Sequence, residues 1–176
     1  YNRDNIDQRR LGELVDLFNS ARFTGLGSTR ARDLLGEVYE YFLEKFAAAE
    51  GRRGGEFYTP AGVVRVLVEI LEPTHGRVYD PACGSGGMFV QSARFVAEHQ
   101  KNPAAELAIC GVEKTDETGR LCRLNLAVHG LEGDIREANT FYQDEHTLRG
   151  KCDRVMANPP FNVDMVDAGK VKDDLR

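Results

Sequence analysis

Apolar residues recur at helical spacing through the first fifty positions of the chain. In residues 6–18 they return every three or four positions, as in an α-helix with one apolar face. Residues 30–50 repeat the pattern, with an apolar stripe of Leu34, Leu35, Val38, Tyr39, Phe42 and Phe46. Glycines in residues 25–29 separate the two segments, and Gly51 ends the second. We therefore expect a helical region and basic linker over residues 1–54, packed as a small cap on the following domain.

After residue 55 the pattern alternates between helix and strand. Thr59 as N-cap and Pro60 at the first helical position predict a helix that ends near Leu71. Its predicted buried residues are Val63, Val64, Leu67 and Leu71, and those of a helix over 88–99 are Met88, Phe89, Ala93 and Val96. Strands are expected at 77–80, 107–112, around Ile135 and at 154–157, with a helix from Thr115 to His129-Gly130. This alternation indicates a mainly parallel α/β sheet.

A glycine-rich loop follows the first predicted strand, where residues 79–87 read Tyr-Asp-Pro-Ala-Cys-Gly-Ser-Gly-Gly. A phosphate-binding P-loop would need Gly-Lys-Ser or Gly-Lys-Thr, which is absent. A dinucleotide fingerprint would need glycine where the chain has Phe89. Asp80 suits an ammonium group, and the following helix N-terminus suits a carboxylate. The methionine half of S-adenosylmethionine carries both groups and fits better than a pyrophosphate, although a simple chain reversal would also use glycines.

An acidic residue ends the next predicted strand. Glu113 is expected to come up beside the glycine loop, because neighbouring parallel strands end at the same edge of the sheet. A carboxylate at that position can accept hydrogen bonds from both hydroxyls of a ribose. A solvated acid at a strand end is the alternative. Together, the loop and Glu113 favour a cofactor that contains a nucleoside.

The tetrapeptide Asn-Pro-Pro-Phe at residues 158–161 follows the last predicted strand. Methylation of an exocyclic amine is difficult because the ring delocalises the nitrogen lone pair, and acceptors held against the N–H hydrogens would localise it. Asn158 offers an amide oxygen, Pro159 a backbone carbonyl in a fixed direction, and Phe161 a face for an extruded base. Cysteine-dependent methylation would need a Pro-Cys pair, which is absent, so Cys83 is interpreted as a small packed residue.

Composition limits the partners and the compartment. The four cysteines form no CxxC pair and no histidine stands at ligand spacing, which disfavours zinc, any other metal site and a disulfide framework. No apolar run reaches the ~20 residues of a membrane span, and no secretory signal is visible, so a cytoplasmic protein is expected. The net charge of −5 argues against a domain that binds DNA without help, through overall electrostatic attraction.

Three motifs in the same order resemble a known family. The motifs are Gly-Glu-Phe-Tyr-Thr-Pro at 55–60, residues 80–87 and residues 158–161. They are similar to those of the methyltransferase (modification) subunit of type I restriction–modification systems, and this subunit is an N6-adenine DNA methyltransferase. The resemblance implies that the cofactor is bound by Tyr58, Thr59, Asp80, Ala82, Gly84, Ser85, Gly86, Glu113 and Asn139. It implies that the target adenine is bound by Asn158, Pro159, Pro160 and Phe161.

The same resemblance implies an architecture, an activity and partners. The expected fold is a Rossmann-like S-adenosylmethionine-dependent methyltransferase domain over residues 55–176. The resemblance implies a sheet of seven strands, whereas the sequence predicts about four. We therefore expect a sheet that is truncated after the Asn-Pro-Pro-Phe strand. We also expect little catalytic turnover by the chain alone. The expected partners are DNA, a specificity subunit, a restriction endonuclease subunit and a second methyltransferase subunit. Methylation of an RNA base or a protein glutamine, or an assembly module without turnover, remain alternatives.

Overall fold

The computed structural model describes residues 7–9, 12–13, 16, 28–50, 58–161 and 163–172. Most of the predicted helix at 6–18 and the predicted linker lie outside these residues, as does the expected boundary between residues 54 and 55. The helices are α2 (Ser28–Glu50), α4 (Ala61–Leu71), α5 (Gly87–Glu98), α6 (Pro103–Glu106), α7 (Asp116–Val128) and α8 (Ala168–Val171). The strands are β1 (Gly76–Asp80), β2 (Leu107–Glu113), β3 (Gly133–Glu137) and β4 (Arg154–Val155).

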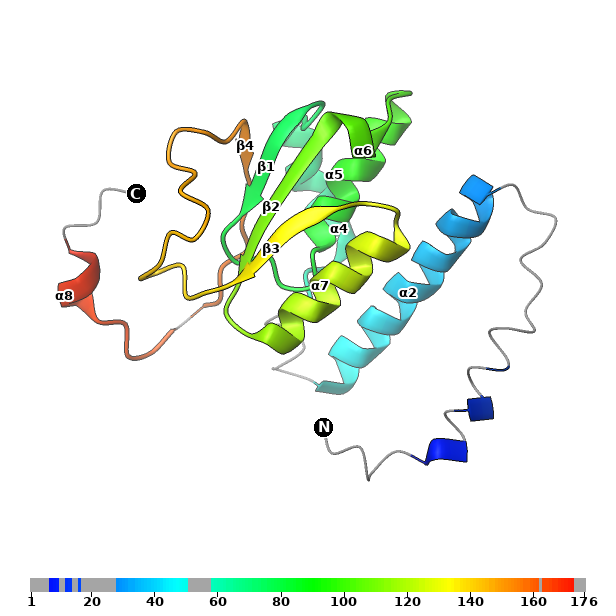
Figure 1. The fold of residues 1–176 in the computed structure, drawn as a ribbon, viewed down its shortest axis with the longest axis horizontal. Helices are drawn as coiled ribbons and strands as arrows, with labels where there is room; N and C mark the ends of the chain where they lie inside the picture. Colours follow the sequence, from blue (N-terminus) through cyan, green and yellow to red (C-terminus); the bar gives the residue numbers. More distant parts are fainter. Residues whose placement is uncertain are drawn as a thin grey trace.

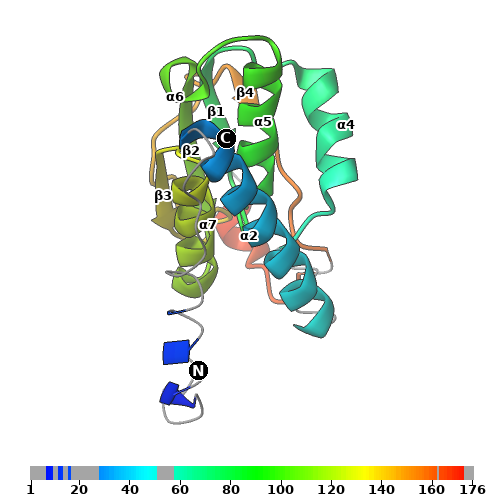
Figure 2. The same cartoon turned by 90° about the vertical axis from the view of Figure 1, so that its right-hand side faces the viewer.

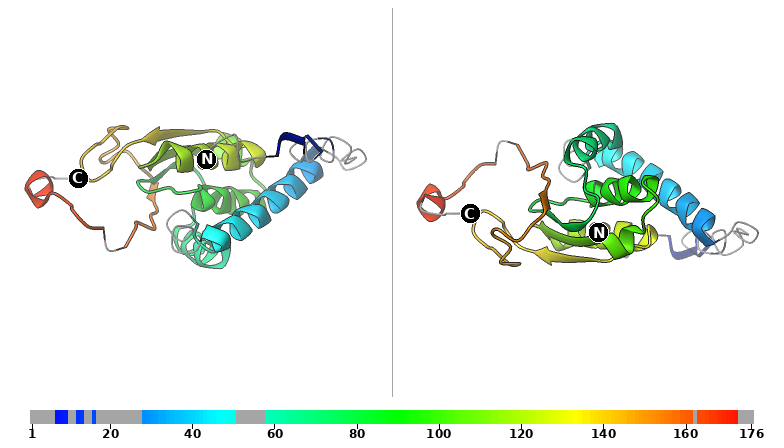
Figure 3. Two further views of the ribbon diagram at one scale, coloured as in Figure 1. Left: turned by 90° about the horizontal axis from the view of Figure 1, so that it is seen from below. Right: turned by 90° about the horizontal axis from the view of Figure 1, so that it is seen from above.

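The strands form one parallel sheet in the order β3-β2-β1-β4 (Figure 1). Helices α5 and α7 connect β1 to β2 and β2 to β3, and both cover the same face of the sheet. Two further helices lie farther from the sheet: α2 packs on α7, and α4 packs on α5 (Figures 2 and 3). The predicted parallel α/β sheet is confirmed, with strands close to their expected positions. Only β4 is shorter than expected, because two of its residues pair with β1.

The core lies between the sheet and the layer formed by α5 and α7. All four residues predicted to be buried on α5 are at most 6% exposed. On α4 the prediction is partly wrong, because Val63 is 55% exposed whereas Val68, which was not predicted, is 2% exposed. Helix α4 packs on α5 and buries Val64 and Val68, one turn apart, whereas Val63 lies about 100° around the helix from Val64.

Helix α2 packs on α7, as the expected cap should, but only part of the predicted stripe takes part in the contact. Leu34, Leu35, Phe42 and Phe46 are each at least 38% exposed, whereas the buried apolar residues are Leu43 and Ala47. The contact depends on small and polar groups: a Cβ on Gly36 would lie 2.6 Å from His129 Nε2. The Tyr39 hydroxyl donates to the Leu121 carbonyl at 3.2 Å. Close backbone approach therefore selects the buried face, which an apolar count does not reveal.

The ends of two helices test the predicted caps. The Thr115 side chain caps α7 by accepting from Thr118 N, and Gly130 follows the helix with a φ of 69°, so both ends are confirmed. At α4 the prediction is wrong. Pro60, not Thr59, occupies the N-cap position, and no side chain caps this helix. The Thr59 hydroxyl contacts Asn158 instead.

The structure also bears on disulfides, metal sites and membrane-spanning helices. All four cysteines are free thiols, and Cys83 is packed at 6% exposure. Among the described residues no group of three or more His, Cys, Asp and Glu side chains could hold a metal ion. Within the same parts of the chain, no helix has the length and apolar character needed to cross a membrane.

Candidate active site

The carboxyl ends of β1 and β2 bring the glycine loop and the second acidic residue together. Strand β1 ends at Asp80 and pairs in register with β2, so that Asp80 lies opposite Gly111, two residues before Glu113. The Gly84 N–H donates to Glu113 Oε2 at 3.1 Å. The expectation that Glu113 lies beside the glycine loop is confirmed. The other Glu113 carboxylate oxygen accepts from the Thr115 N–H at 3.2 Å, which fixes its direction.

The glycine loop, residues 81–87, is held in a conformation that requires glycine. Gly84 and Gly86 have positive φ values of 54° and 80°, which side chains adopt only with strain. A Cβ on Gly86 would also lie 2.7 Å from the Cys122 sulfur on α7. The Cys83 N–H donates to the Val112 carbonyl at 2.9 Å, so the loop is bonded to β2. The conformation of the loop is therefore set by close packing on both β2 and α7.

A buried asparagine supports the loop from below. Asn125 Nδ2 on α7 donates to the Ser85 carbonyl at 2.9 Å, and the residue is 1% exposed. Sequence reasoning missed Asn125. The available signal was a polar residue between Cys122 and Leu126 on the buried face of α7, where a side chain without a partner would be costly.

Asp80 is the most strongly perturbed carboxyl group at this edge. It is 2% exposed and accepts a hydrogen bond from the Ala82 N–H at 2.9 Å. Desolvation by burial raises its pKa to about 7, the Ala82 hydrogen bond opposes this, and the Glu113 carboxylate adds to it. The next helix, α5, has no side-chain cap at its N-terminus. This edge therefore offers a desolvated acid to a cation and free helix N–H groups to an anion.

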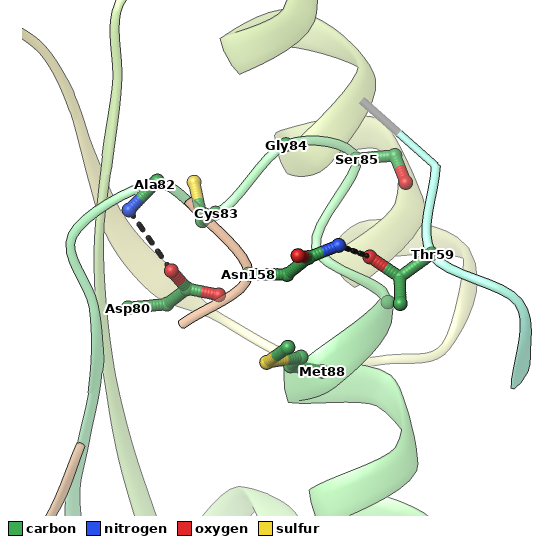
Figure 4. Close-up of a pocket in the computed structure, with 9 residues that line it drawn as sticks. Thr59, Asp80, Ala82, Cys83, Gly84, Ser85, Met88 and Asn158 are labelled. Carbon is green, nitrogen blue, oxygen red and sulfur yellow. Dashed lines mark hydrogen bonds between the residues drawn. The ribbon is translucent and has the colours of Figure 1, made fainter. Parts of the chain in front are cut away.

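Asn158 lies in the same cavity as Asp80, although the two residues are far apart in the sequence. This cavity opens to solvent and is lined by Thr59, Asp80, Ala82, Cys83, Gly84, Ser85, Gly87, Met88 and Asn158 (Figure 4). The Asn158 Nδ2 group donates to Thr59 Oγ1 at 3.0 Å. In Figure 4 the Asn158 amide extends into the space between Asp80 and Thr59. Thr59, predicted to bind the cofactor, and Asn158, predicted to bind the target, thus lie side by side in the lining of the cavity.

Other predicted residues lie near the cavity without lining it. Tyr58 lies near Glu44 and Glu40 of α2. Burial is the main cause that raises the pKa of Tyr58, and these two carboxylates raise it further. Asn139 follows β3 at the same edge of the sheet, but its side-chain oxygen accepts from the Phe141 N–H at 3.1 Å. The loop of Asn139 is tied to the glycine loop, because the Thr140 hydroxyl donates to the Pro81 carbonyl. Gly86 belongs to the glycine loop itself, and Glu113 contacts the loop by accepting a hydrogen bond from the Gly84 N–H group.

The target-side residues after Asn158 are open to solvent. Pro159 and Pro160 are exposed, and the Phe161 side chain is 83% exposed. Cys83, Gly87 and Met88 line the cavity although they were not predicted as site residues. The signal for Gly87 and Met88 was their place at the start of the helix that follows the glycine loop.

This arrangement matches solved methyltransferases in fold. The chain superposes with a TM-score of 0.67 on a class I S-adenosylmethionine-dependent methyltransferase from Listeria monocytogenes, at 13% identity and over 88% of this chain and 46% of that one. The parallel sheet, with a glycine loop after β1 and an acidic end to β2, is thus the fold of S-adenosylmethionine-dependent methyltransferases. Residues 30–176 match the model of the N-6 DNA Methylase family, and the chain belongs to that family.

Two relatives show which branch of the family the chain resembles. It is 44% identical over 168 residues to the methylase subunit of the type I restriction enzyme HindI from Haemophilus influenzae, covering 89% of this chain and 37% of that protein. It is 32% identical to a structure of a type I restriction enzyme modification subunit from Vibrio vulnificus, with a TM-score of 0.65 over 86% of this chain and 32% of that one. The chain spans about a third of the length of the curated relatives it matches.

Proposed function

We propose that the protein transfers a methyl group from S-adenosylmethionine to the exocyclic N6 amine of adenine in DNA, as the modification subunit of a type I restriction–modification complex. The observation that carries this proposal is the shared cavity of Asp80 and Asn158, which places a carboxyl group suited to an ammonium beside an amide suited to a target amine. Family membership and the relatives' names support the choice of adenine in DNA.

The residues around the glycine loop fit the cofactor by their chemistry. Asp80 would accept hydrogen bonds from the ammonium of the methionine moiety, and that cation would stabilise the ionised form of this buried carboxyl group. The uncapped α5 N-terminus would receive the carboxylate. Glu113 would bind the ribose hydroxyls from the end of β2, and the loop of Asn139 would border the adenine. When bound, the cofactor supplies an electrophilic methyl group on a sulfonium.

The residues after β4 fit an amine that must become a better nucleophile. The Asn158 amide oxygen and the Pro159 carbonyl would accept the two amine hydrogens of the target adenine. This places partial negative charge next to the nitrogen as positive charge develops on it. The amine loses its proton after attack, so no strong base is required. Phe161 would stack on the extruded base, and its exposure leaves the ring face available.

The remaining proposals concern partners. A net charge of −5 gives the chain little bulk attraction for DNA. We therefore assign target recognition to a specificity subunit, and assembly to a complex with a second methyltransferase subunit and a restriction endonuclease subunit. The compartment that suits this complex and the free thiols is the cytoplasm.

The test is transfer of radiolabelled methyl groups from S-adenosylmethionine to unmethylated DNA, with the protein and its copurifying partners. The DNA is then digested to nucleosides. Label in N6-methyladenine is the expected result. If cofactor binds and no label enters DNA, the proposal is wrong, and label in RNA or in protein glutamine would identify the substrate instead. Cofactor binding without transfer to any of these would leave an assembly module.

A further inference from the structure

We infer that Thr59 is a positioning residue for the target amine, which it serves by holding the Asn158 amide so that the amide oxygen faces the reacting nitrogen. This inference rests on the proposed function. The resemblance to the family implies a different role for Thr59, that of binding the methionine part of the cofactor. The hydrogen bond from Asn158 Nδ2 to Thr59 Oγ1, at 3.0 Å, points to the role proposed here.

The position of Thr59 frees its hydroxyl for this contact. A threonine that precedes a helix commonly caps it with its side chain, but Pro60 occupies the N-cap position of α4 and no side chain caps this helix. The Pro60 carbonyl accepts from the N–H groups of Val63 and Val64, which ties residue 60 to the first turn. Thr59 is thus attached directly to a fixed helix end, and its hydroxyl oxygen is directed at Asn158.

The two ends of an amide have opposite chemistry. Only the oxygen can accept a hydrogen from the target amine, whereas the NH₂ group would present donors to donors. Because Nδ2 is bonded to Thr59, the oxygen lies on the other side of the amide, toward Asp80 and the middle of the cavity (Figure 4). Rotation of the amide by half a turn would break this hydrogen bond and present the wrong end.

Thr59 also supports Asn158 from a distant part of the chain. Strand β4 pairs with β1 over two residues only, and Pro159 and Pro160, which follow Asn158, are exposed. A side chain that follows so short an edge strand needs a second anchor to hold its direction. The Thr59 hydroxyl, from the start of α4, supplies this anchor across 99 residues of sequence.

The kinetic test compares Thr59→Val with Thr59→Ser in the protein purified with its partners. Valine keeps the shape and removes the hydroxyl, whereas serine keeps the hydroxyl. Thr59→Val should lower kcat for methyl transfer by roughly 10- to 100-fold, as misplacement of a reacting group does, and leave the Kd for S-adenosylmethionine within about threefold. Thr59→Ser should restore most of kcat. A raised Kd with kcat unchanged at saturating cofactor would overturn the inference and return Thr59 to the cofactor.

A second measurement is independent of activity. Thermal unfolding of the wild type, Thr59→Val, Asn158→Ala and the double variant, without cofactor, forms a double-mutant cycle. The shifts in Tm should be less than additive, because either substitution alone removes the same hydrogen bond. Additive shifts would overturn the inference. Coupling in a wild-type protein that methylates no adenine would instead refute the proposed function and leave the contact between Thr59 and Asn158 established.

Discussion

The two sides of the cavity differ in how firmly the chain holds them. The glycine loop is bonded to β2 through Cys83 and Gly84 and is supported by the buried Asn125. The Asn-Pro-Pro-Phe segment follows a two-residue strand. Beyond Asn158 its residues are exposed, up to 83% for Phe161.

This difference indicates that the cofactor side of the cavity is formed by folding alone, whereas, under the proposed function, the target side is completed when DNA binds. The cofactor side is built by folding, because its loop cannot move without breaking contacts with β2 and α7. On the target side Asn158 is held by Thr59, and the described residues that follow it, 159–161, are exposed and open to an extruded base. Substitutions on the two sides should therefore separate cofactor affinity from methyl transfer, and four predictions test that separation.

The largest effect is expected on the target side. Asn158→Ala should reduce kcat by roughly 10²- to 10³-fold, the loss typical of one preorganised group that stabilises developing charge. The Kd for S-adenosylmethionine should stay within about threefold, because the amide acts on the amine. Single-turnover transfer and calorimetric titration measure the two quantities. Equal losses in both would show that Asn158 belongs to the cofactor side. Asn158→Asp, which keeps an acceptor, is the matched control and should retain more activity.

The second prediction concerns stability on the cofactor side. An aspartate has a pKa of about 3.9 in an unfolded chain, whereas burial raises the pKa of Asp80 to about 7. Between these values the folded state binds the proton more tightly, so the free energy of unfolding falls as pH rises from about 4 to 7. The contribution is on the order of 4 kcal/mol. In Asp80→Asn this fall should disappear, so the variant's stability relative to wild type should increase with pH over that range.

Urea unfolding of the cofactor-free protein at pH 5, 6, 7 and 8 measures this difference. Asp134→Asn is the control, and its stability difference from wild type should stay constant from pH 5 to pH 8. A hydrogen bond from the Arg136 side chain lowers the pKa of Asp134, with support from His146. Asp134 therefore contributes stability above its unfolded pKa and loses it as pH falls through the lower folded value. A pH-independent difference between wild type and Asp80→Asn would mean that Asp80 is not desolvated.

The third prediction concerns cofactor affinity. Asp80→Ala should weaken the binding of S-adenosylmethionine by about 1–3 kcal/mol, the cost of leaving a buried charged donor without its acceptor. Affinity in the wild type should rise with pH up to about 7, as the carboxyl group ionises. Calorimetry at two pH values measures both effects. Glu69→Ala, at an exposed site on α4, should leave affinity unchanged. An unchanged titration for Asp80→Ala would remove Asp80 from the binding site.

The sheet and the glycine loop could be predicted from sequence because their signals are local. Alternating apolar runs, Thr115 as a cap, and glycine at positions 84 and 86 each follow from backbone requirements within a few residues. The place of Glu113 followed from a general rule, that parallel strands end at one edge. The roles of the individual site residues remain predictions that the experiments above will test.

The errors arose where partners are distant in sequence. The Thr59 hydroxyl was expected to cap α4, but it bonds Asn158. Four residues of the predicted stripe on α2 stay exposed, and the helix instead approaches the end of α7 closely where Gly36 lies against His129. Val63 was assigned to the core from its type, although the buried residues of α4, which packs on α5, are Val64 and Val68. In each case a specific tertiary contact, which periodicity does not encode, decided the outcome.

The smallest effect should come from the most exposed residue of the target side. Phe161→Ala should leave the free energy of unfolding within about 0.5 kcal/mol of wild type, because a side chain that is 83% exposed contributes little to the core. It should weaken productive DNA binding by about 1 kcal/mol, at the low end of base stacking on an aromatic ring. Phe161→Tyr keeps the ring and should behave as wild type. A KM for DNA that rises several-fold in alanine alone, with cofactor Kd unchanged, would place Phe161 on the base. Marked destabilisation by Phe161→Ala would instead show that the segment is anchored by folding, which would remove the contrast between the two sides of the cavity.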